Sequence, residues 1–154
     1  MTIREDVKYN LKQAMIKKDV NLISALRLVL ASIKDKDIIA KGKGNHTGIN
    51  DEEIISLIQT MIKQRKSSID LYLEGKRHDL AKKEENEIKI ISNFLPSQLS
   101  KHEIDEIINN TIKSNEVNSM KDMGIVIKII KEQYDGMMDF GYVSKVIKEK
   151  LSNL

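Results

Sequence analysis

The segment DEEIISLIQTMIKQRKSSIDLYLEG, residues 51–75, decides the fold, because its apolar side chains recur at the three- and four-residue spacing of an amphipathic helix. Asn50 and Glu53 form a capping-box pattern before it, and Gly75 is a typical left-handed stop at its end. The segment therefore predicts one long helix. Its apolar positions are Ile54, Ile55, Leu57, Ile58, Met61, Ile62, Ile69 and Tyr72.

A second helix follows after a short link. It is expected to begin at Asp79, to run through the charged stretch AKKEENEIK and to end at Leu95. Pro96 sets this end, because proline disfavours helical geometry in the residue before it. Since the link is short, the two helices are predicted to pack antiparallel as a long hairpin.

Helical periodicity extends outward from the hairpin in both directions, and the alternating pattern of a strand does not appear. Thr2 and Glu5 form a capping-box pattern for a helix that reaches about Lys18. Asp19 or Asn21 can cap the helix after it. The amino-terminal part of the chain is therefore predicted to contain four helices.

Pro96 also marks the predicted domain boundary. We expect residues 1–96 to form a helical N-terminal domain that contains the hairpin. Residues 97–154 are expected to form a small three-helix C-terminal bundle. The predicted fold class is all-α.

Three polar residues indicate helix starts in the tail: Ser100, Ser119 and Asp139. Gly124 lies within the second of these starts, SMKDMG, which a helix start alone does not explain. Glycine inside a helix costs about 1 kcal/mol relative to alanine. Gly124 therefore suggests close approach by another helix or by a ligand.

The composition limits the classes of function. Cysteine is absent, which excludes disulfides, thiolate metal sites and a cysteine nucleophile. The three histidines lack zinc-site spacing, so neither a metal nor a cofactor is expected. No apolar stretch reaches about 18 residues, and the N-terminus has no signal-peptide core. A cytoplasmic protein without a membrane partner is therefore expected.

Two further features have both a structural and a ligand-binding interpretation. The glycine-rich segment KGKGNHTGIN, residues 41–50, lacks the spacing of a phosphate-binding P-loop, so a solvated connector is favoured. Arg27 lies inside an apolar helical run. It either snorkels or forms a salt bridge at the helix edge, or it faces a ligand.

The hairpin carries an excess of positive charge, with seven basic and three acidic residues between Thr60 and Lys83, whereas the whole chain has a net charge of +3. Such a run is either a solvated helix face or a patch that contacts phosphate. The candidate nucleic-acid-binding residues are Lys63, Arg65, Lys66, Arg77, Lys82 and Lys83 on the hairpin, with Lys121 and Lys128 in the tail.

Four segments in order resemble the YqeY-like proteins of the GatB/YqeY family. They are LRLVLASIKD, DEEIISLIQTMIKQRKSSID, KKEENEIKIISNFLPSQLS and SMKDMGIVIKII, and the resemblance covers nearly the whole chain. It implies that residues 97–154 are similar to the C-terminal helical domain of the B subunit of the tRNA-dependent amidotransferase. That domain contacts tRNA, while the kinase and amidase chemistry of the enzyme lies elsewhere.

The segment GMMDFG departs from the family pattern Gly-Arg-Ala-Asp-Gly-Lys. Met137 stands at the arginine position and Gly141 at the lysine position, so two cations that could contact phosphate are missing. Met137, Met138 and Phe140 either form an exposed apolar patch for a protein partner or lie in the core between helices. With Gly124 they are the candidate partner-binding residues.

The resemblance and the charge together predict a non-catalytic, tRNA-associated accessory factor related to the amidation of Glu-tRNA(Gln) or Asp-tRNA(Asn). The alternative is a protein-interaction module that docks onto a synthetase or an amidase-type subunit. Carbon–nitrogen ligase activity with glutamine as amido donor is expected only as part of a complex. The sequence has no serine-elbow, Rossmann or P-loop pattern and no plausible catalytic triad.

Overall fold

A computed structural model describes residues 2–153 as seven α-helices and one short 3₁₀ helix. These residues contain no strand, so the predicted all-α class is confirmed. None of the described helices is both long and apolar enough to cross a lipid bilayer. The chain divides into two units, the first ending at Leu95 and the second starting at Pro96.

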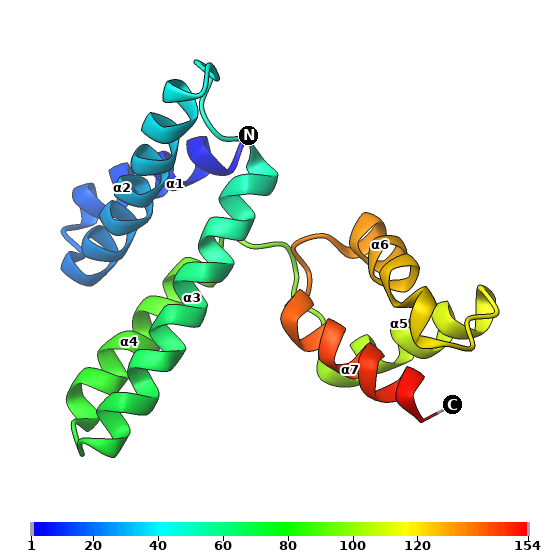
Figure 1. Cartoon of the computed structure of the whole chain (residues 1–154). Helices are drawn as coiled ribbons and strands as arrows, with labels where there is room; N and C mark the ends of the chain where they lie inside the picture. Colours follow the sequence, from blue (N-terminus) through cyan, green and yellow to red (C-terminus); the bar gives the residue numbers. More distant parts are fainter. Residues whose placement is uncertain (1, 154) are drawn as a thin grey trace. The chain divides into compact units, whose positions relative to one another are not determined.

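The first unit consists of two helix pairs. In one pair, α3 (Asp51–Glu74) and α4 (His78–Ser92) lie side by side as a long hairpin (Figure 1). In the other, α1 (Ile3–Lys17) packs along α2 (Val20–Gly42). α2 also packs on α4, and the turn of the α3–α4 hairpin extends beyond α1 and α2 (Figure 1).

The helix starts of the first unit follow local capping chemistry. Thr2 and Glu5 form the predicted capping box of α1, with Glu5 N–H donating to Thr2 Oγ1 at 3.2 Å. Asn50 caps α3 in the same way, and its Oδ1 accepts from the N–H of Glu53 at 2.9 Å. Asp19 caps α2. Each such cap satisfies backbone donors that the first turn leaves without partners.

The ends of the hairpin helices differ from the prediction. Gly75 has an ordinary φ of −80°, and the left-handed residue is its neighbour Lys76 at φ +56°. α4 starts at His78 and stops at Ser92, three residues before the predicted end at Leu95. The residue with positive φ in this turn is therefore a lysine and not the glycine beside it.

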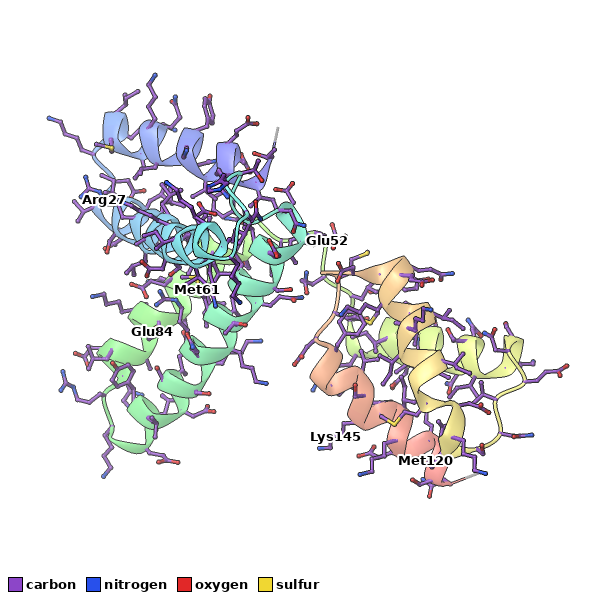
Figure 2. The ribbon with its side chains drawn as sticks, turned by 45° about the horizontal axis from the view of Figure 1, so that its top comes forward. Arg27, Glu52, Met61, Glu84, Met120 and Lys145 are labelled. Atoms are coloured by element: carbon purple, nitrogen blue, oxygen red, sulfur yellow. The ribbon has the colours of Figure 1, made fainter. Side chains whose placement is uncertain are left out.

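The core of the first unit lies where α1, α2 and α4 meet the amino-terminal part of α3. Leu26 and Ile58 are fully buried in it, and Met61 marks its edge on α3 (Figure 2). Burial of one such side chain contributes about 1.5–3 kcal/mol. The buried members are Val7, Ala14, Leu26, Val29, Ile33, Ile54, Ile58, Met61 and Ile91.

The second unit contains three helices, α5 (Lys101–Ser114), α6 (Met123–Tyr134) and α7 (Phe140–Ser152). They surround a separate core. Its buried members are Ile104, Ile108, Val117, Val126, Ile130, Met138, Val143, Val146, Ile147 and Leu151.

Ser119 does not cap α6 in the predicted way. A 3₁₀ turn, η1 (Met120–Asp122), precedes α6, and the Ser119 side chain forms no capping hydrogen bond. Ser100 and Asp139 do cap α5 and α7 through their side-chain oxygens. SMKDMG is therefore a helix start, but it begins with a 3₁₀ turn and not with the side-chain cap that was predicted.

Candidate nucleic-acid interface

The α3–α4 hairpin exposes six lysines that take part in no ion pair with any residue from 2 to 153, and four of them are predicted nucleic-acid contacts. Lys63 and Lys66 are exposed on α3, three residues apart, so they lie on neighbouring parts of one helix face. Lys82 and Lys83 are exposed on α4. Their ammonium groups are therefore available to a dissolved anion or to a phosphate.

Arg65 is not part of this exposed set, contrary to the prediction. Its Nη1 donates to Glu84 Oε2 at 3.0 Å and also pairs with Glu87 across the hairpin. The side chain is only 15% exposed, and Glu84 faces α3 from the neighbouring helix (Figure 2). Arg65 therefore joins the two helices. The prediction that it is a surface contact for phosphate is wrong.

Arg77 lies at the turn of the hairpin and forms an exposed pair with Asp79. The distances from its Nε and Nη2 to the two carboxylate oxygens are both 3.3 Å. These hydrogen bonds raise the pKa of Arg77 and lower that of Asp79. The Arg77 side chain is 58% exposed, so it can still contact solvent or a ligand.

The tail cations lie in the second unit. Lys121 is exposed in η1 and Lys128 is exposed on α6. Neither forms an ion pair with another described residue. Arg27 is also exposed, on α2.

The segment Met137–Phe140 does not form the exposed apolar patch that one interpretation required. Met138 is 2% exposed and belongs to the core of the second unit. Phe140 is half-buried and packs against the same core, and Met137 is half-buried. The Met137 carbonyl accepts from the N–H of Leu99 at 2.9 Å, which ties this loop to the start of the unit. The interpretation as inter-helix core is therefore the one the structure supports.

Gly124 is exposed on α6, and a Cβ added there would meet no atom within 4 Å. The predicted close approach by another helix is therefore wrong. A ligand contact at Gly124 stays a prediction.

The sequence interpretation missed a polar bracket that closes the loop between α2 and α3. Arg4 donates from Nη1 and Nη2 to the Asp37 carboxylate at 2.5 and 3.0 Å, and from Nη2 to the Ile49 carbonyl at 3.0 Å. Ile49 N–H donates to Asp37 Oδ1 at 2.9 Å. We call Arg4, Asp37 and the Ile49 backbone the Arg4–Asp37 bracket. The bond from Arg4 lowers the pKa of Asp37, and that from Asp37 raises the pKa of Arg4.

Gly48 makes room for this bracket. It has φ +87°, and a Cβ there would lie 2.6 Å from Asp37 Oδ1 and 3.1 Å from Arg4 Nη2. The carboxyl end of the loop between α2 and α3 is therefore held in a defined conformation by these contacts. No group of three or more histidine, aspartate or glutamate side chains gathers as a metal site among residues 2–153.

These observations define a class of protein: an all-helical chain of two units that presents lysines on a long hairpin. The model of the Yqey-like protein family matches residues 4–151. The chain belongs to the YqeY-like family, as its sequence resemblance predicted.

Similar proteins are found under the name "Altered inheritance of mitochondria protein 41, mitochondrial". The one from Lachancea thermotolerans is 38% identical over 76% of this chain and 64% of its own length. Those from Vanderwaltozyma polyspora and Saccharomyces cerevisiae are 41% and 36% identical over 59% and 64% of this chain, and 47% and 51% of their own lengths. The chain thus spans less than two thirds of these relatives. Their name places those proteins in mitochondria, and a cytoplasmic location of this chain stays a prediction.

Proposed function

We propose that this YqeY-like chain is a non-catalytic accessory protein that binds tRNA and acts in connection with tRNA-dependent amidation. The observation that carries the proposal is that four of the predicted contacts on the hairpin, Lys63, Lys66, Lys82 and Lys83, are exposed and form no ion pair with a described residue. The link to amidation comes from the resemblance of the tail to the B subunit of the amidotransferase.

The chemistry of the surface suits phosphate better than bases. Each lysine is a compact positive charge that can approach a phosphate oxygen and release counterions from the RNA. Folded RNA is recognised largely by shape and by phosphate and 2′-hydroxyl contacts, so few aromatic side chains are needed. This matches a chain in which aromatic residues make up 4%.

Filter binding of tRNA at several salt concentrations tests the proposal. Replacing Lys63, Lys66, Lys82 and Lys83 by alanine should weaken binding and flatten its salt dependence. The slope of log affinity against log salt should fall by roughly one unit for each lysine that contacts a phosphate. Binding to tRNA should exceed binding to duplex RNA of equal length.

A matched control removes the same charge elsewhere on the first unit. Lys12, Lys17, Lys34 and Lys36 are exposed on α1 and α2, and their replacement by alanine should leave tRNA affinity nearly unchanged. Equal loss in both variants would mean that only net charge matters, and the hairpin would then not be the binding surface.

The alternative function, docking onto a synthetase or an amidase-type subunit, loses the part of its argument that rested on an apolar patch. It rested on exposure of Met137, Met138 and Phe140 and on a contact at Gly124; Met138 is buried, whereas Gly124 is exposed and a partner contact there stays a prediction. No feature of residues 137–140 now favours it over RNA binding.

A further inference from the structure

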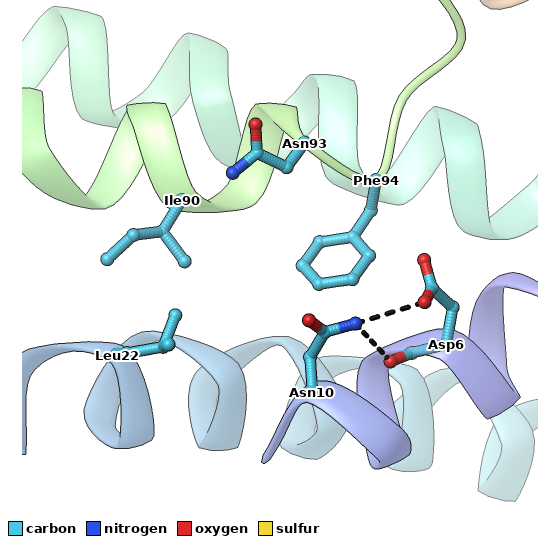
Figure 3. A pocket seen from close by; sticks show the side chains of 6 residues that line it. All are labelled: Asp6, Asn10, Leu22, Ile90, Asn93 and Phe94. Atoms are coloured by element: carbon cyan, nitrogen blue, oxygen red, sulfur yellow. Dashed lines mark hydrogen bonds between the residues drawn. The ribbon is translucent and has the colours of Figure 1, made fainter. Parts of the chain in front are cut away.

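The first unit contains a pocket of about 260 Å³ that the proposed function does not use. Residues of α1, α2 and the carboxyl end of α4 line it, and it is open to solvent on the side of Asn93 (Figure 3). Three of its six lining residues are apolar and three are polar. The lining residues are Asp6, Asn10, Leu22, Ile90, Asn93 and Phe94.

The polar atoms of the pocket are mostly hydrogen-bond acceptors. The Asn10 amide nitrogen donates to the Asp6 backbone carbonyl at 2.8 Å and to Asp6 Oδ1 at 3.0 Å (Figure 3). This uses the donors of Asn10 and leaves its Oδ1 without a hydrogen-bond donor among residues 2–153. Asp6 Oδ2 and the side-chain amide of Asn93 also have no hydrogen-bond partner in that range. The pocket therefore offers three acceptor groups and one donor group.

The charge of the pocket is negative. Asp6 forms no ion pair with any residue that the structure describes, and no lysine, arginine or histidine lines the pocket. A phosphate or carboxylate ligand would be repelled by the Asp6 carboxylate. The chemistry thus selects a cation that donates several hydrogen bonds.

The size of the pocket and the aromatic ring in its wall indicate which cationic group fits best. Pockets for drug-sized ligands usually measure about 300–1,000 Å³, so this one suits a group of side-chain size. Phe94 presents a flat ring between Asn93 and Asn10 (Figure 3). A guanidinium is planar, carries five donors and no acceptor, and stacks on aromatic rings, whereas an ammonium is compact and more strongly hydrated.

We infer that the pocket formed by Asp6, Asn10, Asn93 and Phe94 binds a guanidinium group. One edge of the guanidinium donates to the Asp6 carboxylate, another donates to the amide oxygens, and its plane rests on Phe94. Two sources supply this chemistry: a small guanidino compound, or an arginine side chain of a protein. A phosphate backbone carries no guanidinium group, so this inference does not depend on tRNA binding.

NMR titration of the whole chain, following the side-chain amide signals of Asn10 and Asn93, tests the inference. The probes are methylguanidinium, agmatine and a capped Gly-Arg-Gly peptide, and urea serves as the neutral control of the same shape. The guanidinium probes should shift both signals saturably, and urea should not. Binding of the peptide about tenfold tighter than methylguanidinium indicates a protein source, and equal binding indicates a small compound.

Substitutions show whether the pocket itself is responsible. Asp6→Asn should weaken binding about tenfold, since it removes one charge-assisted hydrogen bond. Glu85→Gln, an exposed change on α4, should have no effect. If Asp6→Asn fails to fold by circular dichroism, Asn93→Ala at an exposed site replaces it and should still weaken binding measurably. Absence of saturable shifts with every guanidinium probe, or unchanged affinity in the variant, would overturn the inference.

Discussion

Replacing Gly48 by alanine tests the Arg4–Asp37 bracket most directly. The new Cβ would lie 2.6 Å from Asp37 Oδ1, closer than real Cβ contacts, and the backbone there has φ +87°. The carboxylate cannot move away freely, because it accepts from Arg4 and from the Ile49 N–H. The substitution should therefore combine backbone strain with loss of hydrogen bonds.

The two contributions can be estimated separately. An alanine in the left-handed region costs about 1–2 kcal/mol, of which about 0.4–1 kcal/mol is offset because alanine restricts the unfolded chain. Hydrogen bonds to a charged group contribute about 1.5–3 kcal/mol each. With the loss of one such bond, Gly48→Ala should destabilise the protein by about 3 kcal/mol.

Gly44 supplies the matched control. Its φ of +94° is similar, but a Cβ added there meets nothing within 4 Å. Gly44→Ala should therefore cost only about 1 kcal/mol. Urea unfolding measures both changes, and the difference between them reports the bracket. If the two variants lose the same stability, or if the excess cost of Gly48→Ala persists when Asp37 is also replaced by alanine, the reasoning fails.

The remaining predictions concern Asp37 and three other sites, with Arg27 as a control. The pKa of Asp37 is lowered in the folded protein, so the ionised carboxylate stabilises the fold above the unfolded-state pKa of about 3.9. This stabilisation is lost as the pH falls through the folded-state pKa. Urea unfolding at pH 2 to 5 should therefore depend less on pH in the Asp37→Asn variant. Arg65→Ala leaves two partly buried glutamates without their cation and should cost about 3–5 kcal/mol in chemical denaturation, whereas Arg27→Ala at an exposed site should change stability by less than about 0.5 kcal/mol. Gly124→Ala should raise stability by up to about 1 kcal/mol, and a loss of stability would show that a close contact exists there. Met138→Ala should lower the midpoint of thermal unfolding and cost about 2–5 kcal/mol, which an exposed methionine would not do.

The sequence predicted best what local chemistry controls. Thr2, Asn50 and Ser100 each cap a helix as expected, because a cap involves a side chain and a backbone amide only three residues away. The helical class follows from periodicity for the same reason. Gly75 shows the limit of this approach, since the left-handed turn falls on Lys76 and is set by the packing of two helices.

Arg65 shows which signal was present but overlooked. The apolar positions of α3 run as far as Ile62 and resume at Ile69, and Arg65 lies in that gap, four residues after the buried Met61. A charged residue on the buried stripe requires an opposite charge on the facing helix, and Glu87 supplies it. The Arg4–Asp37 bracket left no such signal, because its members are far apart in the sequence.

The two hydrophobic cores have a consequence for how this protein can change. One core draws its members from residues up to Leu95 and the other from residues after Pro96. A chain cut at that point would leave both sets of interior contacts whole. We therefore expect the tail to keep its interior when gene fusion attaches it to a different partner.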